Sequence, residues 1–394
     1  MFTKVLKESI YLIKKTLLKD LKNSIKKILI AHSSNDKYGA SKVLISIIDI
    51  FINDGIEVHL LLPNNGPLNE NKTIKKTKLS IIKLGVFRKR YFTVFGLINR
   101  FYLIIKSSLF IRKYLKKNQI DLVYTNTSTL ISPSIAAKLS GLPSHFHIHE
   151  IPNGNPIYAR FITAFVNVFA RKIICVSKSV YDFWTKNGLK KSKAKIIHNG
   201  FNIKKSKSKI LNNDKIVFTS ISRIIPYKGH SLMIKIFEIL CRKNKNICLQ
   251  IIGDTLPEYQ KYLDGLKLDI KKRGLNNKIK FLGFKNDVLS VLEKSSFFIH
   301  IPTSPDPLPT VIFEAISCKI PVITNSLGGS FEILDDGKNG LIIKNYNIEE
   351  SVEKILSYLD NKKLQNENVK NAFNYINKNL SFEQFKNKIL NIVE

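Results

Sequence analysis

The chain has 394 residues, which suggests two or three domains. Hydrophobic residues make up 44% of it, enough to bury real cores, and this argues against a largely disordered chain. The formal net charge of +34 favours anionic partners such as nucleic acid, acidic lipid head groups or phosphorylated substrates, although a codon bias toward Lys, Ile and Asn explains it equally well.

Residues 1–24 are expected to form a basic amphipathic helix. Apolar residues recur there at helical spacing among many lysines, namely Leu6, Ile10, Ile13, Leu17 and Leu21. Such a helix could lie on an anionic membrane surface, or it could pack on the following domain with its lysines in water.

Residues 25–203 alternate short apolar strands with longer amphipathic segments. Strands are predicted at Lys27–Ser33, Glu57–Leu62, Asp121–Thr125, His145–His149 and Lys172–Val176. Helical patterns lie between them, for example at Lys42–Ile52 and Pro133–Leu139. Strand–helix alternation with nearly continuous apolar strands indicates a parallel, doubly wound sheet.

A charged stretch over residues 204–214 is interpreted as a linker, after which the alternation restarts over residues 215–380. Strands are predicted at Ile216–Ile221, Ile247–Ile252, Ile279–Leu282, Phe297–Ile301, Val322–Thr324 and Leu341–Ile343. A last helix is expected within residues 381–394. The chain is therefore expected to carry two α/β units of similar size.

No segment reads as a signal peptide or a membrane span. The best apolar candidate, Thr93–Ile111, is interrupted by Arg100 and Lys106. The four cysteines show no zinc-site spacing and are expected to be buried small hydrophobes: Cys175, Cys241, Cys248 and Cys318. We expect a cytoplasmic protein, at most peripheral on the inner face of the plasma membrane.

Ligands of open α/β sheets bind beyond the carboxyl ends of the strands, so the residues that follow each strand are candidates. In the first unit, the turn Tyr38-Gly39-Ala40-Ser41 opens a helix whose free N–H groups could face an anion, although many such turns are purely structural. His149 ends a strand, where it is either a hydrogen-bonded structural residue or a functional group of the cleft.

In the second unit, Arg223 and Lys228 follow the strand Ile216–Ile221 and form a candidate diphosphate clamp, the alternative being two solvated cations. Further on, prolines at alternate positions keep Asp306 on a loop and make Pro309 suited to a first helical turn. Glu314 then lies in the second turn, where both carboxylates can face one cleft.

A Gly328-Gly329 turn follows the strand Val322–Thr324 and precedes a helix. Paired glycines there allow backbone N–H groups to approach an anion or a sugar hydroxyl, or they serve only the turn.

These motifs together resemble the group-1 (family 4) retaining glycosyltransferases with the GT-B fold. The matching elements, in order, are Tyr38-Gly39-Ala40-Ser41, His198-Asn199-Gly200, Arg223-x4-Lys228-Gly229, Asp306-x7-Glu314-Ala315, Pro321-Val322, Gly328-Gly329-x2-Glu332 and Asn339-Gly340. The resemblance spans residues 26–394. It implies two Rossmann-like domains that face each other across a cleft, an acceptor domain before the linker and a nucleotide-sugar donor domain after it.

The resemblance also implies roles for matched residues. Arg223 and Lys228 would neutralise the departing diphosphate, and Glu314 would hold the ribose hydroxyls. Asp306 would touch the donor sugar, and His149 would lie near the reacting sugar. Further donor-binding positions are Gly39 and Ala40, whose N–H groups would face the phosphates, and Leu308, Thr310, Gly328 and Gly329.

Two positions depart from the family pattern. Asp306 stands where Glu is usual, which leaves the donor sugar open. Tyr38 stands where the first of two glycines is usual, which weakens the phosphate contact on that side.

The implied activity is a retaining, hexosyltransferase-type transfer from a nucleotide-diphosphate sugar to a saccharide or lipid-linked saccharide, in cell-surface polysaccharide or glycolipid synthesis. No Asp-x-Asp motif suggests a metal, since Arg223 and Lys228 supply positive charge, and no cofactor beyond the nucleotide-sugar is expected. The alternatives are a nucleotide-sugar epimerase of the same fold and, with no recognition motif found, a nucleic-acid-binding protein.

Overall fold

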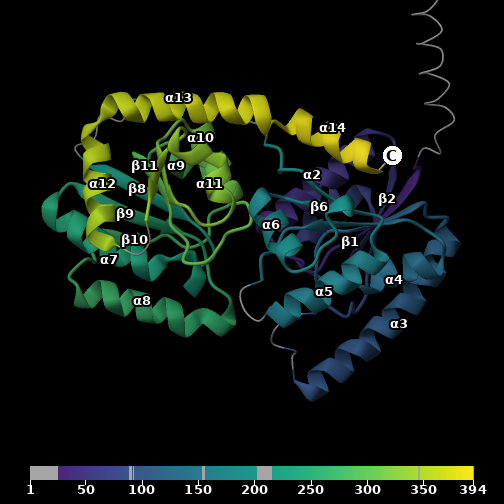
Figure 1. Ribbon diagram of the computed structural model, residues 1–394. Coiled ribbons are helices and arrows are strands. Elements are labelled where there is room, and N and C mark those ends of the chain that lie inside the picture. The colour runs from purple at the N-terminus through teal and green to yellow at the C-terminus, as the bar shows by residue number, and fades with distance from the viewer. Residues whose placement is uncertain are drawn as a thin grey trace, which may run out of the picture.

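The computed structural model describes residues 25–87, 91, 93–152, 156–201, 215–344 and 347–393, which form two α/β domains side by side (Figure 1). The helix predicted over residues 1–24 and the linker predicted over 204–214 lie outside the described residues.

The N-terminal domain is built on a seven-stranded parallel sheet with the order β3-β2-β1-β4-β5-β6-β7. Its strands are β1 (Lys27–Ala31), β2 (Glu57–Leu62), β3 (Lys78–Ile81), β4 (Leu122–Thr125), β5 (Ser144–Ile148), β6 (Lys172–Cys175) and β7 (Ala194–Ile196). The α-helices that connect them are α2 (Gly39–Asn53), α3 (Val94–Asn118), α4 (Ser132–Leu139), α5 (Pro156–Phe169) and α6 (Lys178–Lys186). Its central strands are apolar and buried, as expected for a sheet covered on both faces.

The C-terminal domain repeats this plan with the order β10-β9-β8-β11-β12-β13. Its strands are β8 (Ile216–Ile221), β9 (Ile247–Ile252), β10 (Ile279–Phe281), β11 (Phe297–His300), β12 (Val322–Asn325) and β13 (Leu341–Ile343). Its helices are α7 (His230–Lys243), α8 (Gln260–Lys272), α9 (Leu289–Leu292), α10 (Thr310–Ser317), α11 (Gly329–Ile333), α12 (Ile348–Asp360) and α13 (Lys362–Asn379).

The predicted pair of doubly wound parallel sheets is confirmed. In both sheets the strand order reverses next to the first strand, between β1 and β4 and between β8 and β11. Such reversals open a crevice at the carboxyl ends of the strands, where ligands bind in this class of fold. Two edge strands, β3 and β7, were not predicted, because both are short and carry exposed Lys residues.

The chain returns to the N-terminal domain at its last helix. In Figure 1, α13 crosses from the C-terminal domain and α14 (Phe382–Val393) lies on the N-terminal one. Phe385 and Ile389 of α14 join the hydrophobic cluster that holds Leu44 and Phe51 of α2. The Lys172 ammonium donates to the carbonyl of Ile392 at 2.7 Å. The helix predicted at the end of the chain therefore completes the core of the first domain.

Candidate active site

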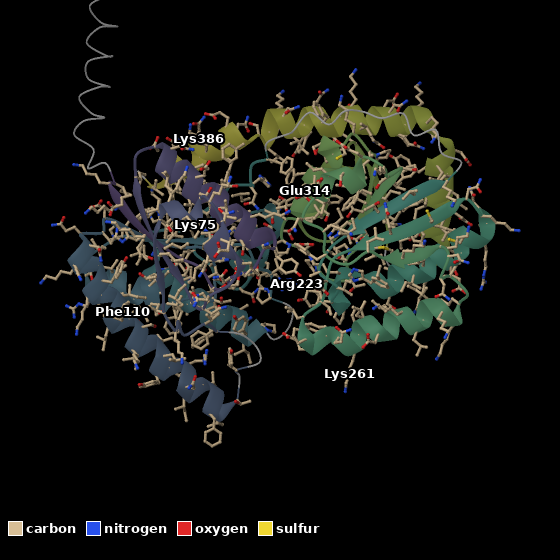
Figure 2. All side chains as sticks on the ribbon, turned by 180° about the vertical axis from the view of Figure 1, so that it is seen from behind. Lys75, Phe110, Arg223, Lys261, Glu314 and Lys386 are labelled. Atoms are coloured by element: carbon tan, nitrogen blue, oxygen red, sulfur yellow. The ribbon has the colours of Figure 1, made fainter. Side chains whose placement is uncertain are left out.

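Two adjoining cavities of about 450 and 360 Å³ lie between the domains, and residues of both domains line each of them. Gly39, Arg223 and Thr310 line both cavities. Glu314 lines the larger one, and the smaller is lined by Ala40, His149, Lys228, Asp306 and Leu308. Figure 2 shows Arg223 and Glu314 in this region between the two domains. The fold thus brings most of the predicted site residues together.

Arg223 follows β8 and reaches across to the turn that precedes α2. Its guanidinium carbon lies 3.6 Å from the centre of the Tyr38 ring, and its Nη2 lies 3.5 Å from Oδ2 of Asp36. The other Asp36 oxygen accepts hydrogen bonds from the Tyr38 amide at 3.1 Å and the Ser41 hydroxyl at 2.8 Å. Burial alone would raise the pKa of Asp36, but these hydrogen bonds and Arg223 lower it, so the carboxylate stays charged.

Lys228 ends a short turn after Pro226, and its ammonium contacts Oδ2 of Asp306. The next residue, Gly229, has φ +80°, and a Cβ there would lie 2.0 Å from the carbonyl oxygen of Ile301. Only glycine fits so close to that backbone, and this contact fixes the position of Lys228 above the strand ends.

Asp306 is buried on the loop after β11, where His300 Nε2 donates to its Oδ2 at 2.9 Å. Burial opposes its charge, but Lys228 and His300 outweigh this and hold the pKa of Asp306 below its usual value. Pro309 caps α10 just outside the helix, one position before the predicted first turn. Asp306 is therefore a preformed carboxylate that is paired with one of the two site cations.

Glu314 lies in the second turn of α10 and is 8% exposed. Its Oε1 accepts from the Lys42 ammonium of α2 at 2.6 Å, which joins the two domains. Its Oε2 is buried and has no hydrogen-bond partner among the described residues. A buried carboxylate oxygen without a donor is costly, so this atom is suited to accept from a ligand hydroxyl.

His149 is the cavity end of a hydrogen-bond chain in the N-terminal domain. Its Nε2 lies 2.8 Å from Asn126 Oδ1, and the Asn126 amide lies 3.2 Å from His32. His32 in turn lies 3.3 Å from the Ser41 hydroxyl, which donates to Asp36. Burial holds the pKa of His149 well below its ordinary value, so the ring is neutral and can neither carry charge nor repel a cation.

The Gly328-Gly329 turn lies behind the Asp306 loop. The Gly329 amide donates to the carbonyl of Asp306 at 2.8 Å, and a Cβ at Gly328 would lie 2.1 Å from that oxygen. Among the described residues, those that line the two cavities include neither glycine. Both glycines therefore pack closely on the backbone of the Asp306 loop, and their direct contact with a donor stays a prediction.

Glu332, in the same motif, connects the domains. Its two carboxylate oxygens accept from the backbone amides of Lys178 and Ser179, at 2.7 and 2.8 Å, at the N-terminus of α6. His198 Nε2 lies 2.9 Å from one of these oxygens. A carboxylate at a helix N-terminus is favoured by the free amides and the helix dipole. Glu332 therefore occupies the anion site at the N-terminus of α6 and ties the two domains together.

Within the described part of the chain, no group of three or more His, Cys, Asp or Glu side chains is arranged to hold a metal ion. Cys175, Cys241 and Cys318 are buried as predicted, whereas Cys248 is only half-buried because β9 is partly exposed there.

Two family models match the chain in succession. The one described as Glycosyltransferase Family 4 matches residues 38–205, and the one described as Glycosyl transferases group 1 matches residues 202–375. Each model therefore covers one of the two domains.

Known proteins agree with this match. Over 371 residues the chain is 25% identical to the UDP-Gal:alpha-D-GlcNAc-diphosphoundecaprenol alpha-1,3-galactosyltransferase of Escherichia coli, covering 87% of this chain and 91% of that enzyme. It is 29% identical over 213 residues to an uncharacterized glycosyltransferase of Methanocaldococcus jannaschii, covering 54% of this chain and only 56% of that relative. The fold is similar to that of Anabaena HepE in complex with UDP and glucose, with a TM-score of 0.79, 22% identity and coverage of 94% and 99%.

Proposed function

The chain belongs to the group-1 glycosyltransferases of family 4, and we propose that it transfers a hexose from a nucleotide-diphosphate sugar to a saccharide acceptor with retention at the anomeric carbon. The observation that carries this proposal is the pair of cations, Arg223 and Lys228, which line one cavity together with the buried Asp306. Neither the epimerase nor the nucleic-acid alternative is favoured by any feature of this cavity.

The chemistry follows from where charge develops. Breaking the bond between sugar and diphosphate leaves an oxocarbenium-like carbon and a new negative charge on the phosphate. Arg223 and Lys228 would stabilise that charge, and the N-termini of α2 and α10 add partial positive charge beside the cavities. Because both cations belong to the chain itself, we propose that the transfer needs no metal ion.

Donor binding would exchange the partners of one ion pair and fill one unpaired carboxylate oxygen. The diphosphate would draw Lys228 from Asp306, which frees that carboxylate to accept from hydroxyls of the donor sugar. Glu314 would accept ribose hydroxyls at its unpaired Oε2. The neutral ring of His149 lies at the same cavity, where it would orient the sugar without charge repulsion.

Retention requires the acceptor to attack from the face that the diphosphate leaves. We infer that the departing phosphate, held by Arg223 and Lys228, guides the acceptor hydroxyl to that face.

The relatives suggest the substrates. The Escherichia coli enzyme is named for UDP-galactose and a diphosphoundecaprenol-linked sugar, and HepE binds UDP and glucose. We propose a uridine-diphosphate hexose as donor and a lipid-linked saccharide as acceptor, in cell-surface polysaccharide synthesis on the cytoplasmic side of the membrane.

A panel of nucleotide sugars tests the proposal. Thermal shift should single out UDP-sugars over GDP-mannose, and an accepted donor should be consumed faster when a saccharide acceptor is added. NMR of the product should show the anomeric configuration of the donor. Donor conversion to an epimer without any acceptor would instead identify an epimerase, and inverted product would remove the retaining mechanism.

A further inference from the structure

Helix α3 presents an apolar stripe on the surface of the N-terminal domain. Of the exposed large hydrophobic side chains among the described residues, half lie on this one helix. Phe101 packs its ring on Phe87 of the domain, and Phe110 stacks on Tyr114 of α3 itself. The other six are Val94, Phe95, Ile98, Tyr102, Ile105 and Leu109. At about 100° per residue, these six positions fall within an arc of about 100° of the helix. Soluble surfaces rarely expose so continuous an apolar face without a partner for it.

The opposite face of α3 fixes how the helix lies. Ile104, Ile111 and Leu115 are buried in the core of the domain, and the Ser108 hydroxyl donates to the carbonyl of Ser132 in α4 at 3.2 Å. By length and composition alone α3 could cross a membrane. Because one face is packed on the domain, the helix instead lies along its outer edge (Figure 1). The exposed stripe can therefore enter a membrane only from the side.

Charge on the same stripe indicates the partner. The apolar arc continues into exposed Arg112, Lys113 and Lys116 in the last turns of the helix, and α3 contains no acidic residue. Arg100 lies outside this arc and stacks on Tyr91 at 4.1 Å, whereas exposed Lys106 lies at the edge of the arc with its ammonium over the Tyr102 ring. An apolar stripe that runs into basic residues fits a bilayer with an apolar interior and anionic head groups. Lysines, in contrast, are depleted from the centres of protein interfaces.

We propose that α3 docks the N-terminal domain on an anionic lipid bilayer, with its first four turns in the interface and its basic end among the head groups. The proposal rests on the proposed function only in that a lipid-linked acceptor would lie in such a bilayer. Docking through α3 leaves the donor cavities, which α3 does not line, open to soluble nucleotide sugar.

Sedimentation of the full chain with vesicles of phosphatidylglycerol and phosphatidylcholine tests the apolar part. We expect binding that weakens as salt rises. The double variant Ile98→Asp with Ile105→Asp should bind about tenfold more weakly, because it places charge in the interface. Leu268→Asp with Leu364→Asp makes the same change at exposed sites of the other domain and should bind like the unmodified chain. Equal binding by the α3 variant would overturn the proposal.

A second pair tests the basic part. In the double variant Arg112→Gln with Lys116→Gln, the affinity for anionic vesicles should fall about fivefold for each charge removed, since each charge contributes about 1 kcal/mol at an anionic surface. Lys261→Gln with Lys267→Gln on α8 is the matched control. Absence of vesicle binding by the unmodified chain would also overturn the proposal, and a dimer broken by the α3 variant would assign the stripe to a second copy. Stabilisation by UDP should be unchanged in every variant, so its absence would count against the proposed function alone.

Discussion

The turns after the first strand of each sheet, β1 and β8, are equivalent in topology but differ in charge. The turn after β1 carries Asp36 and Lys37, whose charges balance, and the Tyr38 ring. The turn after β8 carries the cations Arg223 and Lys228 and no acidic residue. The two turns meet between the domains, where Arg223 stacks on Tyr38 and faces Asp36. The second domain thus supplies both cations, and the first domain supplies the Tyr38 ring and the Asp36 carboxylate that hold Arg223 in place.

The difference teaches that neither domain contains a complete site. Lys228 is positioned within its own domain by Asp306, whereas Arg223 is positioned by the opposite domain. Glu314 likewise takes its cation, Lys42, from across the cleft. Variants on the two sides should therefore fail in different ways.

The largest effect is expected on the cationic side. Arg223→Ala and Lys228→Ala should each lower kcat/KM by about 10²–10³, since each removes a fixed charge from the developing phosphate, at a cost of about 3–4 kcal/mol. Turnover of the UDP-sugar by purified variants measures this, with Lys235→Ala on the surface of α7 as the control. Near-normal rates in both variants would remove the diphosphate assignment.

The next effect concerns the nucleotide. Glu314→Gln should weaken donor binding by about 1.5–3 kcal/mol, because the ribose hydroxyls would then donate to a neutral amide and no longer to a charged carboxylate. Titration of UDP by calorimetry measures it, and the acceptor KM should change less. A donor dissociation constant equal to that of the unmodified enzyme would place Glu314 outside the nucleotide site.

A smaller effect is expected on the opposite turn. Tyr38→Leu removes the ring under Arg223, which should cost about 1 kcal/mol, or about fivefold in kcat/KM. Tyr38→Phe keeps the ring and serves as the matched variant. If Leu and Phe behave alike, the stack does not position Arg223, and the two turns act independently.

No effect is expected from chelation. Since Arg223 and Lys228 supply the positive charge, EDTA should leave the transfer rate unchanged. Loss of activity that Mg²⁺ or Mn²⁺ restores would show that the cationic turn is insufficient without a metal.

The sequence predicts most of the fold because its strands are nearly continuous apolar runs. Ile216–Ile221 and Ile247–Ile252 are predicted to the residue, because each run is bounded on both sides by polar residues or glycine. The edge strands β3 and β7 escape prediction because an edge needs fewer apolar residues, and Lys78 and Lys195 there look like loop residues.

The site is predictable where it is local in sequence. Arg223, Lys228, Asp306 and Glu314 follow strands of one domain at fixed spacings. Lys42 has no such signal, because it is one of many lysines in the chain and gains its role only from Glu314, 272 positions further along. The pairing of Asp36 with Arg223, 187 positions apart, is equally unpredictable from the sequence, because it forms only when the two domains pack together.

The return of α14 to the first domain has a consequence for biogenesis. The hydrophobic cluster around Phe51 is unfinished until Phe385 and Ile389 have been synthesised, so the domain that begins first on the ribosome is completed last. The hydrophobic cluster of the second domain has no member from α14, so this domain can fold before the first domain is complete. Nascent chains arrested before residue 382 should therefore show a protease-resistant second domain attached to a sensitive first one.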